Sequence, residues 1–232
     1  MDRRQFNSIP WLAAVIVLAQ DRALALSIDD LTNKEAAQGL KTALEQGAIA
    51  AVNILGKPDG FLGNEKVRIP LPGYLEDVSK LLRTFGQSSR VDELVTAMNR
   101  AAEAAVPMAK DLLVSAAKSM NVIDAKKILT GGDTAVTAFF VEKTRAPLSV
   151  KFLPVVTKAT EKVGLAEKYN QVAGKAFDFG LVKKEDANIQ QYITGKSMDG
   201  LFLMIGEEEK KIRQDPVGTG SALLKKVFGA LQ

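Results

Sequence analysis

The sequence contains neither cysteine nor histidine. These two absences exclude disulfide bonds, thiol nucleophiles, histidine acid–base catalysis and most zinc sites. An enzyme built from this chain would therefore have to work with carboxylates, lysine, tyrosine or hydroxyl groups. We predict no metal site and no cofactor, and we favour a non-enzymatic function.

The sequence also lacks a strong excess of one charge. Its 31 basic and 27 acidic residues give a net charge of +4. Proteins that bind nucleic acid need a concentrated basic face, so we expect no nucleic-acid partner. Hydrophobic residues make up 47% of the chain and charged residues 25%, which is typical of a globular protein.

No long apolar run marks the N-terminus as a membrane span. The run from Ile9 to Ala19 is too short to cross a bilayer and has the length of a signal-peptide core. Arg3 and Arg4 precede it, as in twin-arginine export signals. A small-x-small cleavage site ends at Ala25. We therefore expect residues 1–25 to be a signal peptide, through either the twin-arginine or the general secretory route.

The expected mature chain, residues 26–232, would be periplasmic or associated with the cell envelope, with no transmembrane span. The alternative is that the N-terminal run is a buried or membrane-anchoring helix. Pro10 and the shortness of the run make that alternative the weaker one.

Apolar residues recur at helical spacing along most of residues 26–232. Thr32 and Glu35 form a capping-box pattern at the start of the first predicted helix, and Gly56 ends it. Further helices are expected over the segment YLEDVSKLLRTFG, from Ser89 onward, near Ile123 to Leu129, from Leu165 to Phe177, and after Pro216.

Six signals are expected to divide these helical stretches. Pro107 should kink or split one helix, and Gly131-Gly132 should break another. Pro147 suits the first turn of a new helix, which Pro154 should then bend. Asp186 can cap a short helix, and Ser197 can cap a longer one that runs to about Gln214. Since no linker and no repeat is present, we predict a single all-α domain of about nine or ten helices with one long ordered extended loop.

Several long segments resemble one bacterial family. They read LKTALEQGAIAAVNILGKPDGFLGNEKVRIPLPGYLEDV, MNRAAEAAVPMAKDLL, ILTGGDTAVTAFFVEKT and DGLFLMIGEEEKKIRQDPVGTGSALLKKVFG. On these segments the chain resembles the family called domain of unknown function 4197, over roughly residues 28–230. The resemblance implies an exported or envelope-associated, largely helical protein. It implies no activity and no catalytic residue.

The long loop is GKPDGFLGNEKVRIPLPG, residues 56–73. Val67, Ile69 and Leu71 alternate with other residues at a spacing of two, which indicates extended backbone. They alternate with Arg68, Pro70 and Pro72, and the two prolines lack an N–H donor and exclude a central strand. Loops beyond about 12–15 residues are usually functional or disordered, and the large apolar side chains argue against disorder.

We therefore predict that this loop is ordered and anchored by Phe61 and Leu62. One interpretation is a structural flap that covers the end of the first helix. The other is an edge that recognises a partner or ligand, with Asp59, Asn64 and Arg68 as its polar groups.

The segment GEEEKKIR supplies the last candidate, Glu208. Its spacing from the apolar residues Leu201, Ile205 and Ile212 places it on their stripe, where a carboxylate must find a partner. A structural ion pair is the favoured explanation, and a catalytic acid is the alternative. Glu207 and Glu209 are expected on a solvated face, in pairs with Lys211 and Arg213.

Two classes of function remain. The favoured one is an exported, non-enzymatic binding or interaction protein, whose partner would be an envelope protein or an apolar small ligand. The alternative is a hydrolase-like enzyme that uses carboxylates such as Asp59 and Glu208. An enzyme requires such groups to converge in an open cleft, whereas a binding protein requires an apolar cavity or exposed patch.

Overall fold

A computed structural model describes residues 33–75, 84, 86, 88–132, 134–161, 164–178, 180, 183 and 187–214. Over these residues the chain is helical and contains no strand. The α-helices are α1 (Asn33–Leu55), α3 (Ser88–Ala105), α4 (Lys110–Ser119), α5 (Val122–Thr130), α6 (Ala135–Thr160), α7 (Gly164–Asp178) and α8 (Ile189–Gln214). Two short 3₁₀ helices are η2 (Gly73–Leu75) and η3 (Val106–Ala109).

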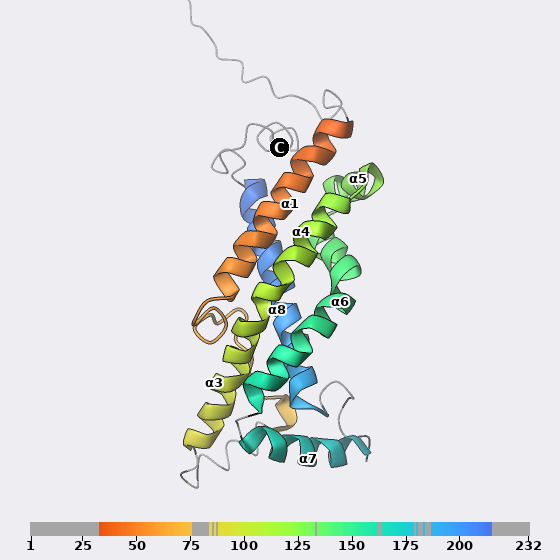
Figure 1. Cartoon of the computed structure of the whole chain (residues 1–232). Coiled ribbons are helices and arrows are strands. Elements are labelled where there is room, and N and C mark those ends of the chain that lie inside the picture. The colour runs from red at the N-terminus through yellow and green to blue at the C-terminus, as the bar shows by residue number, and fades with distance from the viewer. Residues whose placement is uncertain are drawn as a thin grey trace, which may run out of the picture.

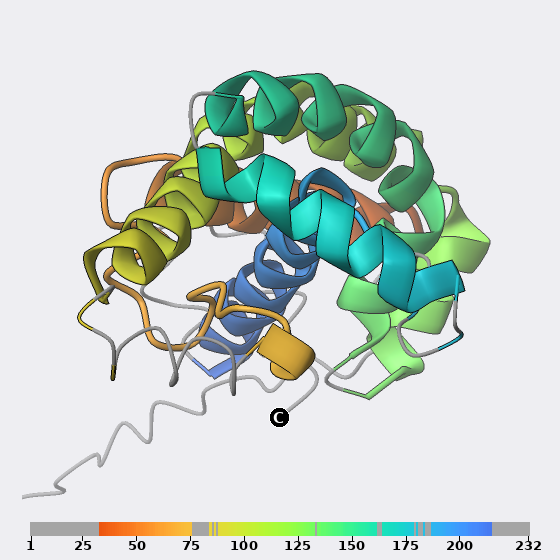
Figure 2. The ribbon, with the colours of Figure 1, turned by 90° about the horizontal axis from the view of Figure 1, so that it is seen from below.

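The helices form an elongated bundle, with α7 lying across one end (Figure 1). Helix α8 contacts α1, α3 and α6, and α1 also packs against α4. Figure 2 shows α6 passing over the bundle on the side opposite the long loop. The long loop begins at the C-terminal end of α1. This end lies beside the junction of α3 and α4 (Figure 1).

Small residues allow the helices to approach closely. Ala51 of α1 and Ala101, Ala105 and Ala109 of the α3–η3–α4 segment are all fully buried. Large side chains fill the remaining space, and those with almost no exposed surface include Leu40, Leu55, Met98, Leu113, Phe140, Leu148 and Phe152. The burial of these apolar surfaces is the main stabilising term for the bundle.

The prediction of about nine or ten helices is wrong. The described residues form six when α3, η3 and α4 are counted as one rod. Pro107 interrupts this rod as predicted. It lies in the 3₁₀ helix η3, which separates the α-helices α3 and α4. Gly131 also ends α5 as predicted, with extended backbone after Thr130.

Pro147 does not begin a new helix, which corrects the sequence prediction. It lies inside α6 together with Pro154. Each proline removes one backbone hydrogen bond and costs about 3 kcal/mol or more in a helix interior. Both prolines are exposed, and the opposite face buries a continuous apolar row that includes Leu148, Phe152 and Val156. That burial outweighs the local cost, so the helix continues.

Ser197 is not a helix cap either. It is fully buried inside α8, and its Oγ donates to the carbonyl of Ile193 at 2.7 Å. The cap is Asn188, whose side-chain oxygen accepts from the backbone N–H groups of Gln190 and Gln191 at 2.9 and 3.0 Å. An asparagine in this position satisfies N–H groups that the first helical turn leaves open.

Several expectations fall outside the described residues. These are the signal peptide, the cap at Thr32, most of the segment YLEDVSKLLRTFG, the cap at Asp186 and the helix after Pro216. None of the described helices combines the length and apolarity needed to cross a membrane.

Candidate binding site

The long loop begins with a tight turn at the end of α1. Asp59 has a φ of 65°, a left-handed conformation that aspartate tolerates better than most residues. A Cβ on Gly60 would lie 2.4 Å from the carbonyl oxygen of Leu55, so only glycine fits there. The turn reverses the chain and directs Phe61 back toward the helices.

Phe61 is fully buried and packs against α8. The contact is close, because a Cβ on Gly200 would lie 2.8 Å from the Phe61 ring. Val67, also buried, lies against the same glycine. The loop is therefore anchored in the core, because Phe61 and Val67 pack against α8 at Gly200, which has no side chain.

A buried carboxylate holds the start of the loop from the other side. Glu103 of α3 accepts hydrogen bonds from the backbone N–H groups of Phe61 and Leu62, at 3.0 and 3.1 Å. Its second oxygen accepts from Arg100 at 2.7 Å, and Arg100 also donates to Asp59 at 2.8 Å. The Glu103 and Asp59 carboxylates raise the pKa of Arg100 above its ordinary value.

Asn99 holds the extended part of the loop. Its side-chain oxygen accepts from the N–H of Ile69 at 2.8 Å, and its side-chain nitrogen donates to the Ile69 carbonyl at 3.0 Å. The amide nitrogen also donates to the Val95 carbonyl of α3 at 2.8 Å. The asparagine thus pairs with Ile69 as a neighbouring strand would, and Asn99 is itself fully buried.

Helix α8 supplies two further attachments. The Tyr192 hydroxyl donates to the Pro70 carbonyl at 3.1 Å. Lys66 forms an ion pair with Glu207, and the hydrogen bond from Lys66 lowers the pKa of Glu207. The loop is consequently fixed to α3 on one side and to α8 on the other.

Between the loop and α8 lies a groove of about 220 Å³, which we call the loop groove. It is lined by Lys66, Val67, Arg68, Ile69, Pro70, Lys196, Asp199, Gly200 and Leu203. Arg68 and Lys196 are exposed on its opposite walls. Leu203, which is 45% exposed, adds an apolar surface. The groove thus combines two cationic side chains with an accessible apolar one.

Asp199 is the acidic residue of the groove, and its charge is already compensated. One of its oxygens accepts from Arg145 of α6 at 2.8 Å. Lys196 lies with its ammonium 5.7 Å from the centre of the Tyr192 ring, which is within cation–π range. Since Lys66 and Asp199 are in ion pairs, Arg68 and Lys196 give the groove an excess of positive charge.

The structure places the five predicted site residues in different surroundings. Arg68 lines the loop groove, whereas Phe61 is buried in the core beneath it. Asn64 shapes a turn, since its carbonyl accepts from the N–H groups of Val67 and Arg68. Asp59 pairs with Arg100, and Glu208 pairs with Lys211 of its own helix. Neither of these two carboxylates lines the loop groove.

The acidic run GEEEKKIR is arranged differently from the predicted pattern. The Glu208 side chain is 14% exposed and pairs with Lys211 three residues on. Glu207 reaches across to Lys66 of the loop instead of Lys211. Glu209 is buried, so its predicted place on the solvated face is wrong. Glu209 lies on the side of α8 that faces α1, next to residues such as Leu40 and Leu44.

Among the described residues, no group of three acidic side chains is placed to hold a metal ion. Asp59 and Glu208 are each neutralised by a different basic residue. Neither carboxylate lines the loop groove, so the groove does not bring together the two groups that the hydrolase-like alternative would use.

The sequence analysis did not identify Asn99 and Glu103, which hold the loop, or Lys196, which lies on the α8 wall of the loop groove. Asn99 and Glu103 were detectable in principle, because they recur at a spacing of four beside the apolar stripe of α3. Lys196 carries no such signal. It is an exposed lysine on a long helix, and only the packing of the loop against α8 brings it opposite Arg68.

The fold and the groove define an all-helical protein with a structured loop clamped between two of its helices. The family model described as a protein of unknown function (DUF4197) matches residues 30–229, and the chain belongs to this family. No curated protein and no solved structure matches the chain.

Proposed function

We propose that this protein is a non-enzymatic binding protein of the cell envelope and that the loop groove is its binding site. The observation that carries the proposal is the opposition of Arg68 and Lys196 across a groove whose backbone wall is fixed by buried side chains. A flap that only covers the core would need the burial of Phe61. It would not need a cationic, accessible groove above it.

The chemistry of the groove defines the partner. Two cations favour a carboxylate or another anion, and the exposed part of Leu203 favours an apolar group close to it. A protein segment that carries an acidic residue next to an apolar one has both features. A small amphiphilic acid is the other occupant with this chemistry.

The fixed loop supports recognition in a second way. Because Ile69 is paired on both its N–H and its carbonyl, the wall of the groove does not have to become ordered when a partner binds. A preformed site avoids the entropic cost of ordering a flexible segment. The clamped loop is therefore suited to binding.

The test uses the purified protein and a panel of fluorescent peptides that pair an apolar residue with an acidic, neutral or basic one. We expect saturable binding of the acidic peptides, weakened by added salt. The double variant Arg68→Ala/Lys196→Ala should reduce the affinity at least tenfold and leave the unfolding temperature unchanged. The matched control, Lys110→Ala/Lys151→Ala, removes two exposed lysines outside the groove and should bind as the native chain does.

Equal binding by the two double variants would contradict the proposal. Mass spectrometry of molecules that copurify from the host envelope would identify the natural occupant. The envelope location rests on Arg3, Arg4 and the site at Ala25. N-terminal sequencing of the cellular protein tests it, and an intact Met1 or Asp2 on all molecules would argue against cleavage.

A further inference from the structure

A second surface lies on α5, and no part of the loop groove contributes to it. Val122 and Ile123 begin this helix and are 46% and 67% exposed. They place two adjacent apolar side chains on the surface of a helix whose other face packs in the core. We call the face that carries them and the neighbouring lysines the α5 face.

Helical geometry places these side chains together. Lys126 follows Val122 by four residues, and Lys127 follows Ile123 by four, so the four side chains share one side of the helix. All four are exposed, whereas Ala125 and Ile128 on the other side are 2% exposed and belong to the core. The α5 face is therefore apolar at its start and cationic along its length.

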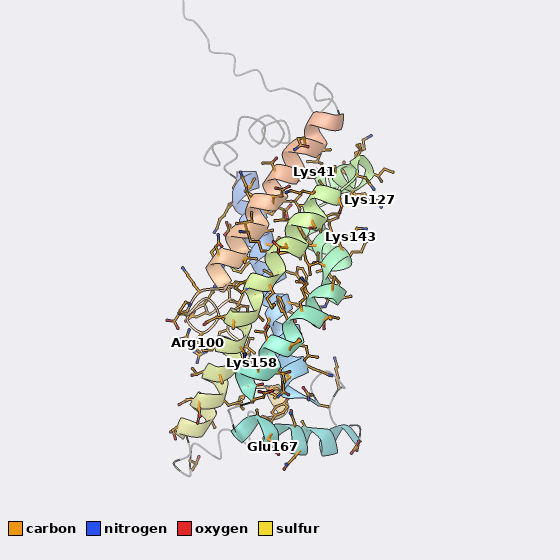
Figure 3. All side chains as sticks on the ribbon, viewed as in Figure 1. Lys41, Arg100, Lys127, Lys143, Lys158 and Glu167 are labelled. Atoms are coloured by element: carbon orange, nitrogen blue, oxygen red, sulfur yellow. The ribbon has the colours of Figure 1, made fainter. Side chains whose placement is uncertain are left out.

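Further lysines surround this face. Lys118 is exposed near the end of α4, and Lys41 of α1 lies close by, because its ammonium donates to the Lys118 carbonyl at 3.0 Å. Figure 3 shows Lys41, Lys127 and Lys143 gathered toward the same end of the molecule, far from Lys158 and Glu167. This end thus combines exposed apolar side chains with a cluster of lysines.

Two acidic residues, Asp124 and Glu142, lie beside the α5 face and line the hollow next to it. Asp124 accepts from the backbone N–H of Asn121 in a capping box, and Glu142 accepts from Lys143 at 2.8 Å. Within the part of the chain that the structure describes, neither Lys126 nor Lys127 forms an ion pair. Lys127 and Lys143 also border a hollow of about 410 Å³ between α5 and α6.

We propose that the α5 face docks on an anionic lipid surface. Val122 and Ile123 would enter the interface, and the lysines would lie at the level of the lipid phosphates. The charge pattern selects this occupant, because lysines flanking a small apolar tip match a negative surface with an apolar interior. This proposal is independent of the loop groove, so either can fail without the other.

The test exploits the absence of cysteine, which makes a single introduced thiol the only labelling site. The full chain carrying Ile123→Cys is labelled with a polarity-sensitive dye and mixed with vesicles of phosphatidylglycerol and phosphatidylethanolamine in equal parts. We expect a blue shift of the dye emission. The control is the same dye on Val150→Cys, a 74% exposed residue in the second half of α6, which should not shift.

Charge dependence is tested with a reversal pair. Lys126→Glu/Lys127→Glu should weaken vesicle binding, followed by the dye at position 123, at least tenfold. Lys151→Glu/Lys158→Glu makes the same charge change on exposed residues of α6 and should bind as the parent does. Binding to phosphatidylcholine vesicles should be much weaker than binding to the anionic ones.

Three results would overturn the proposal. They are an unshifted dye at position 123, an equal shift at position 150, and equal weakening by the two charge-reversal pairs. Groove variants such as Arg68→Ala/Lys196→Ala should leave the dye shift intact, which separates the α5 face from the proposed binding groove.

Discussion

At the scale of single residues, Asn99 solves a problem that the prolines of the loop create. Pro70 and Pro72 cannot donate hydrogen bonds, so this part of the loop cannot join a sheet. Ile69 between helices still needs partners for its own N–H and carbonyl, because it is 1% exposed. The Asn99 amide supplies both from one side chain, at 2.8 and 3.0 Å.

The first prediction concerns this amide. Asn99→Leu should destabilise the protein by about 2–5 kcal/mol, because both backbone groups of Ile69 would lose their partner in a buried site. Asn99→Asp should also destabilise at neutral pH, since a buried carboxylate would face the Ile69 and Val95 carbonyls. Its stability should partly recover in acid, where the protonated side chain can donate again. Urea unfolding at two pH values measures both effects.

The control for Asn99→Leu is the same substitution at an exposed asparagine. Asn53 lies on the exposed face of α1, so Asn53→Leu should change stability by well under 1 kcal/mol. A similarly small effect for Asn99→Leu would show that the loop does not depend on the clamp.

At the scale of elements, local signals in the sequence predicted some helices correctly and failed for the two longest. The glycine after α1 and the pair after α5 mark real helix ends. Inside α6 and α8, Pro147 and Ser197 gave equally clear signals, yet both helices continue through them. The burial of one whole face stabilises α6 and α8 enough for each helix to continue. A local sequence signal carries no information about this tertiary burial.

The loop shows the same division. Its order and the burial of Phe61 followed from its apolar content, and the alternation around Arg68 followed from its spacing. The partners of the loop could not be predicted in this way. Glu103 lies 42 residues from Phe61, and Asn99 lies 30 residues from Ile69. Tertiary packing brings these residues together, and the spacing within the loop says nothing about it.

The second prediction concerns two glycines of α8. A Cβ on Gly200 would meet the buried Phe61 ring at 2.8 Å, whereas a Cβ on Gly195 has no atom within 4 Å. Gly195→Ala should therefore stabilise the protein by about 0.5–1 kcal/mol through helix propensity alone. Gly200→Ala should destabilise it by about 1–3 kcal/mol, since the ring is enclosed and cannot move away.

Thermal unfolding of the two variants measures this difference, and each serves as the control for the other. Opposite signs are expected from the same substitution in the same helix. If Gly200→Ala stabilised the protein as much as Gly195→Ala, Phe61 would not be anchored against α8.

At the scale of the whole molecule, α8 connects the helical bundle to the proposed binding groove. It contacts α1, α3 and α6, and it forms one wall of the loop groove. The loop in turn joins α8 to α3 through Tyr192 and Asn99. Because Phe61, Val67 and Ile69 of the loop are buried in the core, a shift of the whole loop would alter both the groove and the packing against α8.

The third prediction uses the ion pair that ties the loop to α8. Lys66 lowers the pKa of Glu207 in the folded protein, so the pair stabilises the fold at pH values above the ordinary pKa of glutamate. This contribution should be lost as the pH falls through the lowered pKa. Glu207→Gln should accordingly have a slightly lower unfolding temperature than the native chain at neutral pH, and the difference should disappear in acid.

The size of the effect is limited, because the Lys66 side chain is 61% exposed and that of Glu207 is 34% exposed. Backbone hydrogen exchange is the more sensitive measurement, since it reports local opening of the loop. At neutral pH, Glu207→Gln should speed exchange of amides such as those of Val67 and Arg68 and leave α6 unchanged. Glu93→Gln, an exposed change on α3, should alter neither. Equal exchange in the two variants would mean that this ion pair does not hold the loop against α8.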